Sequence, residues 1–306
     1  MSELSRREAI GAAGLAALAS LPVCAEPIKP SILISLNTST LMGHKLPITK
    51  VIDIAAKAGF NAIEPWIREL DEHVKSRGSL SDLRKQIEGH GMKVISSIGF
   101  FDWIVDDDKR RASALEEARR NMELVQKIGG LRLAAPPSGA TDNADLNLMR
   151  AAERYRALLE IGEKFGVVPQ AEIWGFSKCL NNLGSASMVA LESHHPNACI
   201  LPDVFHLHKG GSDFKSILKL NGNMMHNFHI NDYPANIALD KVTDADRVYP
   251  GDGDAPLVEL LQDLKTIGYK GALSLELFNK ELWKADPFTV AKNGAKKIKD
   301  LIAKVG

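Results

Sequence analysis

The chain has 306 residues, 45% of them hydrophobic and 25% charged, so it carries enough apolar material for a sizeable globular core. Lysine plus arginine and aspartate plus glutamate each total 38, and the net charge is zero. This balance argues against a general nucleic-acid binder or a protein of anionic membrane surfaces, both of which show a basic excess, but it leaves room for a small anionic substrate.

Residues 1–25 have the pattern of a targeting segment that is not part of the fold. Arg6 and Arg7 give a charged start, an apolar stretch rich in Ala, Gly and Leu follows, and small residues precede Glu26. Paired arginines are typical of a twin-arginine signal, although Ala9 stands where that motif usually has phenylalanine. We therefore expect export to the periplasm, or a cytoplasmic protein if the leader is not functional.

Two alternatives for this leader remain open, an uncleaved amphipathic helix and lipid modification of Cys24. The apolar stretch is shorter than the roughly 20 residues of a membrane span, and no other segment predicts one. The domain prediction is thus an export signal over 1–25 and one catalytic domain over 26–306.

Eight β-branched or apolar runs follow, each separated from the next by a loop and an amphipathic stretch. They cover residues 31–37, 62–65, 93–98, 131–134, 167–173, 198–203, 226–231 and 272–277. Near-continuous apolar runs of this kind are typical of strands that are buried on both faces of a parallel sheet.

Apolar residues recur at helical spacing between these runs, for example over 48–55 and 257–264. Glycines stand near the predicted helix ends, where a left-handed cap suits glycine. These are Gly59, Gly91, Gly129, Gly166 and Gly268.

Eight strand–helix units predict a closed (β/α)8 TIM barrel, which needs about 250 residues. The alternative is a doubly wound open sheet, which often has a glycine-rich phosphate loop after its first strand; residues 38–43 contain no such motif. The three cysteines, Cys24, Cys179 and Cys199, match no zinc motif or disulfide framework, although a Cys179–Cys199 bridge remains an alternative.

Four consecutive predicted strands each end with a side chain that can bind a metal: Glu172, Asp203, His229 and Glu276. The carboxyl ends of barrel strands meet at one opening, and three carboxylates brought together there would repel one another unless a cation joins them. Three oxygen donors and one imidazole suit one divalent ion, Mn, Mg, Co or Zn. Taken singly, each carboxylate is as readily a helix cap or a salt-bridge partner.

The last third of the chain resembles a known family. The runs DVFHLH at 203–208, FHIND at 228–232, DRVYPGDG at 246–253 and LSLELF at 273–278 are similar to those of the xylose isomerase-like barrels grouped as sugar phosphate isomerases and epimerases. Within that group they most resemble the 2-keto-myo-inositol (inosose) isomerases. The resemblance extends over about 31–304.

The resemblance implies that Glu172, Asp203, His229 and Glu276 ligate the metal and that Glu172 and Glu276 act as the acid/base pair. It also implies that His206 and Arg247 contact substrate oxygens. A metal that binds a ketone and its neighbouring hydroxyl acidifies the adjacent C–H, so that a carboxylate can remove the proton and give an enediolate.

Glu64, at the end of the second predicted strand, and Trp174, directly after the fifth, are expected to line the opening and to contact substrate. Structural roles without a function remain alternatives for three of these residues. Arg247 follows Asp244 and Asp246, so it could form a salt bridge within its loop. Glu64 could equally be a buried carboxylate bonded to backbone, and His206 could be a loop histidine whose hydrogen bonds are all made within the protein.

The leading functional prediction is a metal-dependent isomerase or epimerase of a keto-sugar or keto-inositol. A lyase or dehydratase is the alternative, because the same enediolate can expel a neighbouring group. The neutral charge argues against a nuclease relative, and a sugar-binding protein would not need this ligand set. Ketose 3-epimerases often carry glutamate where this chain has Lys178, which counts against a free-ketose epimerase. The expected partner is a sugar or cyclitol ketone, with no nucleic acid and with homo-oligomerisation left open.

Overall fold

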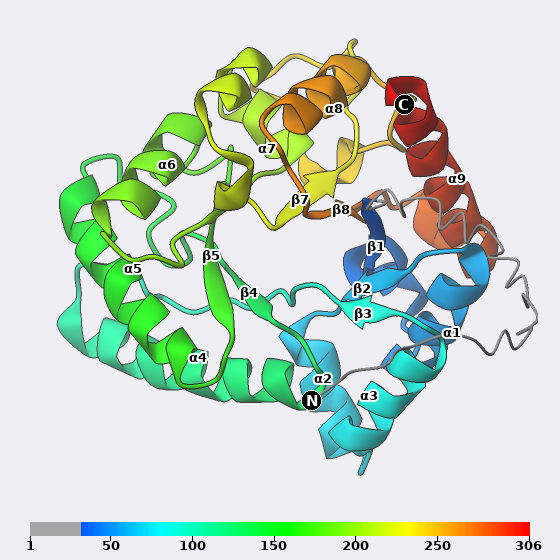
Figure 1. Cartoon of the computed structure of the whole chain (residues 1–306), viewed down its shortest axis with the longest axis horizontal. Coiled ribbons are helices and arrows are strands. Elements are labelled where there is room, and N and C mark those ends of the chain that lie inside the picture. The colour runs from blue at the N-terminus through cyan, green and yellow to red at the C-terminus, as the bar shows by residue number, and fades with distance from the viewer. Residues whose placement is uncertain (1–31) are drawn as a thin grey trace, which may run out of the picture. The chain divides into compact units, whose positions relative to one another are not determined.

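Eight parallel strands alternate with helices over residues 32–306, the part of the chain that the computed structural model describes (Figure 1). The predicted export signal lies outside the described residues. The strands are β1 (Leu33–Asn37), β2 (Ala62–Glu64), β3 (Lys93–Val94), β4 (Arg132–Ala135), β5 (Val168–Glu172), β6 (Ile200–Leu201), β7 (Asn227–Ile230) and β8 (Ala272–Leu275).

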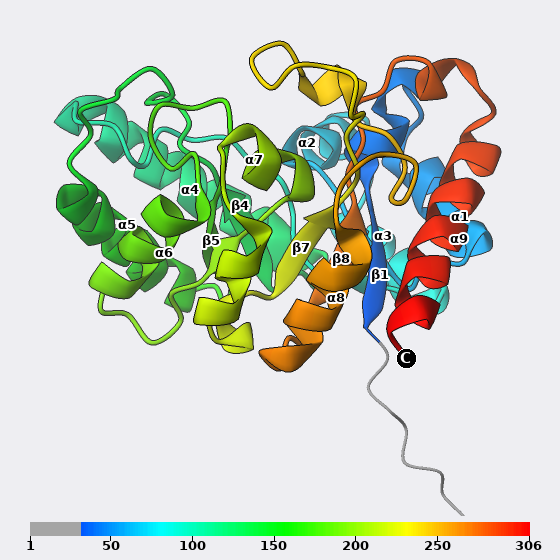
Figure 2. The ribbon, with the colours of Figure 1, turned by 90° about the horizontal axis from the view of Figure 1, so that it is seen from above.

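Helices lie around the outside of these strands (Figure 1). They are α1 (Ile48–Ala58), α2 (Ile67–Lys75), α3 (Leu80–Gly89), α4 (Asp108–Lys127), α5 (Leu148–Glu163), α6 (Leu183–Glu192), α7 (Val204–Lys209), α8 (Leu257–Thr266) and α9 (Pro287–Val305). Short 3-10 helices are η1 (Thr38–His44), η2 (Phe214–Lys219), η3 (Gly222–Met224), η4 (Asp244–Asp246) and η5 (Leu282–Lys284). In Figure 2 the long connection between β7 and α8 lies at the carboxyl ends of the strands.

The strands pair in the order β3-β2-β1-β8-β7 and β4-β5-β6, all in parallel. Isolated backbone contacts connect the two sets. Ser97 N donates to the Arg132 carbonyl, Ala134 N donates to the Ser97 carbonyl, and Asp203 bridges to His229. The predicted closed barrel is therefore confirmed.

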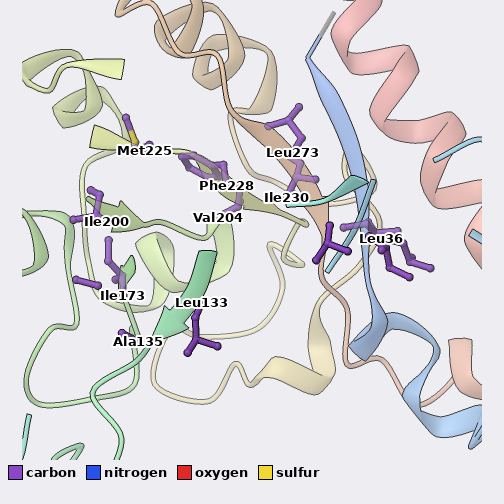
Figure 3. Packing of buried hydrophobic residues seen from close by; sticks show 14 of the residues in the cluster. Leu36, Leu133, Ala135, Ile173, Ile200, Val204, Met225, Phe228, Ile230 and Leu273 are labelled. Atoms are coloured by element: carbon purple, nitrogen blue, oxygen red, sulfur yellow. The ribbon is translucent and has the colours of Figure 1, made fainter. Parts of the chain in front are cut away.

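Successive side chains of each strand point alternately into the barrel and out toward the helices, because side chains alternate between the two faces of a strand. In β7, Phe228 and Ile230 belong to the apolar core between strands and helices, whereas Asn227 and His229 point into the barrel, where both contact Glu64. Figure 3 shows Leu36, Phe228, Ile230 and Leu273 among the packed apolar side chains. The outward faces thus stabilise the barrel, and the inward faces supply polar groups.

Helix ends agree with the glycine pattern. Gly59 ends α1 with a φ of 92° and Gly268 follows α8 with a φ of 76°, and the other three predicted cap glycines also have positive φ. Several strands are shorter than predicted: the third covers only Lys93–Val94, because beyond it the chain contacts its neighbours through single hydrogen bonds such as those of Ser97.

Cys179 and Cys199 are both buried and free, so the alternative of a disulfide between them is wrong. Among the described helices, none combines the length and the apolar character that crossing a membrane would require.

Candidate metal centre and active site

The four predicted metal ligands converge at the carboxyl end of the barrel. Glu172 is the last residue of β5, Asp203 follows β6, His229 lies within β7 and Glu276 follows β8. All four are buried. Asp203, His229 and Glu276 each offer one ligand atom, and these atoms lie within 4.8 Å of one another. Glu172 stands slightly apart from that group of three.

His229 is the centre of this arrangement. Its Nδ1 lies 3.2 Å from Glu276 Oε2, 3.7 Å from Asp203 Oδ2 and 3.9 Å from Glu172 Oε1. None of these contacts has hydrogen-bond geometry, so Nδ1 is buried without a hydrogen-bond partner. Burial alone would lower the pKa of His229, but Glu276 and Glu64 outweigh it and hold that pKa well above its usual range.

Glu64 lies behind His229, not in the opening where we predicted it. It is fully buried and accepts hydrogen bonds from the side chains of Asn37, Asn227 and Ser274, while its Oε2 is 3.0 Å from His229 Nε2. It does not line the cavity described below. A carboxylate on the far nitrogen of a metal-binding histidine orients the ring and increases its basicity, which is the arrangement seen here.

Asn37, the last residue of β1, connects two of these carboxylates and was missed in the sequence. Its Nδ2 donates to Glu64 Oε2 at 3.0 Å and to Glu276 Oε1 at 2.9 Å. Its Oδ1 accepts from Trp66 Nε1 and from the backbone N–H of Ser39. In the sequence, the only indication of this role is that a polar residue stands at the end of a predicted strand, at a position that faces into the barrel.

Arg247 enters the site from the long connection between β7 and α8. It is fully buried, and its Nη1 donates to Asp203 Oδ2 and to Glu276 Oε2, both at 2.8 Å. Its other nitrogens donate to Asp244, so the loop salt bridge that was the alternative explanation also exists. Burial opposes the charge, but Asp203, Asp244 and Glu276 raise the pKa of Arg247 above its usual range.

Arg247 also determines the tautomer of His206, on α7. Its Nη2 lies 3.1 Å from His206 Nε2. A guanidinium only donates, so Nε2 accepts and the imidazole proton resides on Nδ1, which is buried without a partner. Burial, with a contribution from Arg247, lowers the pKa of His206 to about 4 and keeps the ring neutral.

The two glutamates predicted as acid and base have opposite electrostatic surroundings. Burial, followed by the negative charges of Glu276, Glu64 and Asp203, raises the pKa of Glu172 to about 8, against the opposing effect of His229. Burial also acts on Glu276, but His229 and Arg247 outweigh it and lower its pKa. The pKa values of two neighbouring carboxyl groups diverge in this way when their burial and their charged neighbours differ.

The donor set fits a divalent cation. His229 Nδ1 and Glu172 Oε2 are buried without hydrogen-bond partners, and three carboxylates surround that nitrogen. Buried polar atoms are rarely left unpaired. An ion bound by one nitrogen and carboxylate oxygens would satisfy both atoms and offset the negative charge. The binding of a metal stays a prediction.

A cavity of about 330 Å³ opens onto these groups. Its lining includes Glu172, Glu276, His206 and Arg247, together with the predicted Trp174. Of the aromatic residues that follow the third strand, Phe100 lines the cavity, whereas Phe101 and Trp103 are buried away from it. Lys178 is not part of the lining and lies 3.6 Å from Asp142.

Comparison with known proteins agrees with this geometry. The model of a family described as "Xylose isomerase-like TIM barrel" matches residues 52–301. Inosose isomerase of Bacillus velezensis is 29% identical over 242 residues, covering 76% of this chain and 84% of that protein. A 3-dehydroshikimate dehydratase of Pseudomonas aeruginosa is 26% identical over 248 residues, covering 80% of this chain but 38% of that protein.

Among solved structures, the IOLI protein with a bound zinc atom superposes with a TM-score of 0.83 at 24% identity. The match covers 90% of this chain and 99% of that one. At this identity the likeness shows that the two chains share the barrel fold.

Proposed function

The chain belongs to the xylose isomerase-like TIM barrel family, and from this premise we propose that it is an isomerase or epimerase of a keto-inositol or a related keto-sugar, dependent on one divalent metal ion. The observation that carries the proposal is the convergence of Glu172 and Glu276, from β5 and β8, on His229 Nδ1 at the base of one cavity. The inosose isomerases at up to 29% identity support the cyclitol ketone as the substrate.

We propose that Glu172, Asp203, His229 and Glu276 hold the ion, which would be Mn, Mg, Co or Zn. When bound, such an ion polarises a ketone carbonyl and acidifies the neighbouring C–H. Glu64 would act on the ion only through His229, by holding the imidazole with Nδ1 toward the carboxylates.

Proton transfer is assigned to the two glutamates that line the cavity. Glu172 and Glu276 stand on either side of β6 and β7, so one can remove the proton next to the carbonyl and the other can return a proton to the neighbouring carbon. Arg247 lines the cavity and would stabilise the developing negative charge through its own positive charge, because its N–H groups already donate to Asp203, Glu276, Asp244 and His206. His206 and Trp174 both line the cavity, where His206 would contact a substrate oxygen and Trp174 would cover an apolar face of the substrate.

A lyase or dehydratase is the second candidate, because a dehydratase is among the relatives. The same enediolate would then expel a neighbouring hydroxyl or glycosidic oxygen, and the glutamate that returns a proton to carbon in the isomerisation would protonate the departing oxygen instead.

NMR spectroscopy in deuterated water tests both candidates. The protein would be loaded with Mn²⁺, Co²⁺ or Mg²⁺, and a chelated sample would serve as the control, with a panel of inososes, ketoses and 3-keto-glycosides as substrates. We expect solvent deuterium in an isomerised inosose with the loaded protein and none after chelation. Loss of a substituent would identify the lyase. Absence of exchange with every ketone, or full activity without metal, would refute the proposal.

A further inference from the structure

The cavity is surrounded by a closed series of neighbouring side chains, which we call the aromatic collar. Ring centroids are 6.0 Å apart for Phe278–Trp66, 5.2 Å for Trp66–Phe100, 5.6 Å for Phe100–Trp174, 5.2 Å for Trp174–Phe176, 5.7 Å for Phe176–His206 and 5.6 Å for His206–Phe205. The guanidinium of Arg247 completes the series, 4.8 Å from the Phe205 ring and 5.2 Å from the Phe278 ring. All members except Phe205 line the cavity.

Phe100, Trp174 and Phe176 form an aromatic side of the cavity. The charged and ionisable residues of the lining are Glu172, His206, Arg247, Glu276 and Lys280, together with Asp244, which is already bonded to Arg247. Two of the three indole N–H groups of the lining are used within the protein, since Trp66 Nε1 donates to Asn37 and Trp283 Nε1 donates to the carbonyl of Ser39.

The aromatic side is also accessible to solvent. Phe100 is 41% exposed and Phe176 is 49% exposed, and both contact the ring of Trp174. These are two of the three most exposed phenylalanines in residues 32–306, and both lie on the cavity. Large rings exposed together beside a cavity are typical of a binding surface.

We propose that the surface formed by Phe100, Trp174 and Phe176 is a subsite for a flat apolar substituent, such as a phenyl group, carried by the polyol ketone. This inference rests on the proposed function, because it places the ketone at the glutamates. A substituent stacked on these rings would bury exposed aromatic surface without needing hydrogen bonds. The cavity of about 330 Å³ is at the lower end of the roughly 300–1,000 Å³ typical of sites for drug-sized ligands, which suits one polar ring with one such group.

Calorimetry with matched ligands tests the subsite without requiring turnover. The Mn²⁺-loaded protein would be titrated with the methyl and the phenyl glycoside of the same hexose, which carry no ketone and cannot react. We expect the phenyl glycoside to bind about tenfold more tightly, and the double variant Phe100→Ala, Phe176→Ala to reduce this preference to below about threefold. Leu191→Ala, which changes an exposed side chain on α6, should keep the preference.

Three results would overturn the inference: equal binding of the two glycosides, a preference that the double variant keeps, or a disaccharide that gains as much affinity as the phenyl glycoside. Phe176→Leu keeps apolar bulk and should retain more of the preference than Phe176→Ala, which guards against a variant that merely folds poorly. Isomerisation of an inosose without any phenyl preference would refute only the subsite. A phenyl preference without isomerisation would refute only the proposed reaction.

Discussion

Glu64 and His229 form a buried pair in which Glu64 Oε2 lies 3.0 Å from His229 Nε2, and both side chains are fully inaccessible to solvent. The consequence lies on the other side of the imidazole, because this contact directs Nδ1 toward Glu276, Asp203 and Glu172. A residue that cannot reach substrate thereby sets the direction of a candidate metal ligand.

Glu64→Gln should weaken metal binding while leaving all four candidate ligands in place. The amide keeps the shape but loses the negative charge beside the imidazole, and changes to such partners typically lower metal affinity about 10- to 100-fold. Titration of the metal-free protein with Mn²⁺ or Zn²⁺ in a calorimeter measures the effect. Glu69→Gln is the matched control, because this partly buried carboxylate bonds to Thr38 and Trp66, outside the ligand set. Equal affinities for the wild type and Glu64→Gln would contradict the assigned role.

Glu276→Gln and Glu172→Gln should each retain appreciable metal yet lose at least about 10²-fold in turnover. Glutamine keeps one oxygen donor but lacks basicity, and 10²-fold is the low end of general acid–base contributions. The measurement is washout of the substrate's α-hydrogen into deuterated solvent, with metal content checked for each variant. Glu160→Gln, at an exposed pair on α5, is the control. If both variants exchange hydrogen at the wild-type rate, neither glutamate is the base.

Asn37→Ala should destabilise the barrel by about 1–3 kcal/mol, the cost of leaving buried groups without partners, because it removes a donor from Glu64 and Glu276. Asn37→Asp should cost more, since it places a third carboxylate between the other two. Urea unfolding of the metal-free proteins gives the free energies, with Asn197→Ala at an exposed loop position as the control. An Asn37→Asp protein as stable as the wild type would show that this asparagine does not hold the carboxylates together.

His226, just before β7, should make the protein lose stability as the pH falls. Burial, with a contribution from Arg132, lowers its pKa from 6.5 to about 4 in the folded state. The unfolded chain therefore takes up a proton first, so the stabilising effect is complete above pH 6.5 and is lost as the pH falls toward 4. Replacing His226 with glutamine should flatten the stability curve in this window, by less than the roughly 1.4 kcal/mol per pH unit of one fully coupled proton.

Denaturant unfolding at several pH values between 4 and 7.5 measures this slope. His194→Asn is the control, because His194 is exposed and its φ of 50° is one that asparagine tolerates. If the free energy of unfolding of His226→Gln varies with pH as steeply as that of the wild type, this histidine does not contribute to the loss of stability at low pH.

We propose that residues 1–25 direct export by the twin-arginine route. Replacing Arg6 and Arg7 together with lysine should keep the protein in the cytoplasm, because paired arginines define that signal. Fractionation of cells that express the wild-type or the doubly substituted chain measures the distribution between compartments. Normal arrival of the variant in the periplasm would rule the route out.

Much of the architecture could be predicted from the sequence because it depends on local patterns. Eight apolar runs and the helical spacing between them predict the βα units, and glycines such as Gly59 and Gly268 mark helix ends through a backbone conformation that other residues adopt at a cost. The convergence of Glu172, Asp203, His229 and Glu276 also follows from local rules, since parallel strands in a barrel present their carboxyl ends at one side.

The roles of Glu64, Asn37 and Arg247 depended on the tertiary structure. Asn37 meets Glu276, 239 positions away, and Arg247 meets Asp203, 44 positions away, only because the barrel closes in a particular register and the connection after β7 returns to its centre. Such contacts depend on side-chain packing between strands that no local pattern relates. The aromatic collar has the same origin, because its rings come from several separate connections and become neighbours only where those connections meet around the opening.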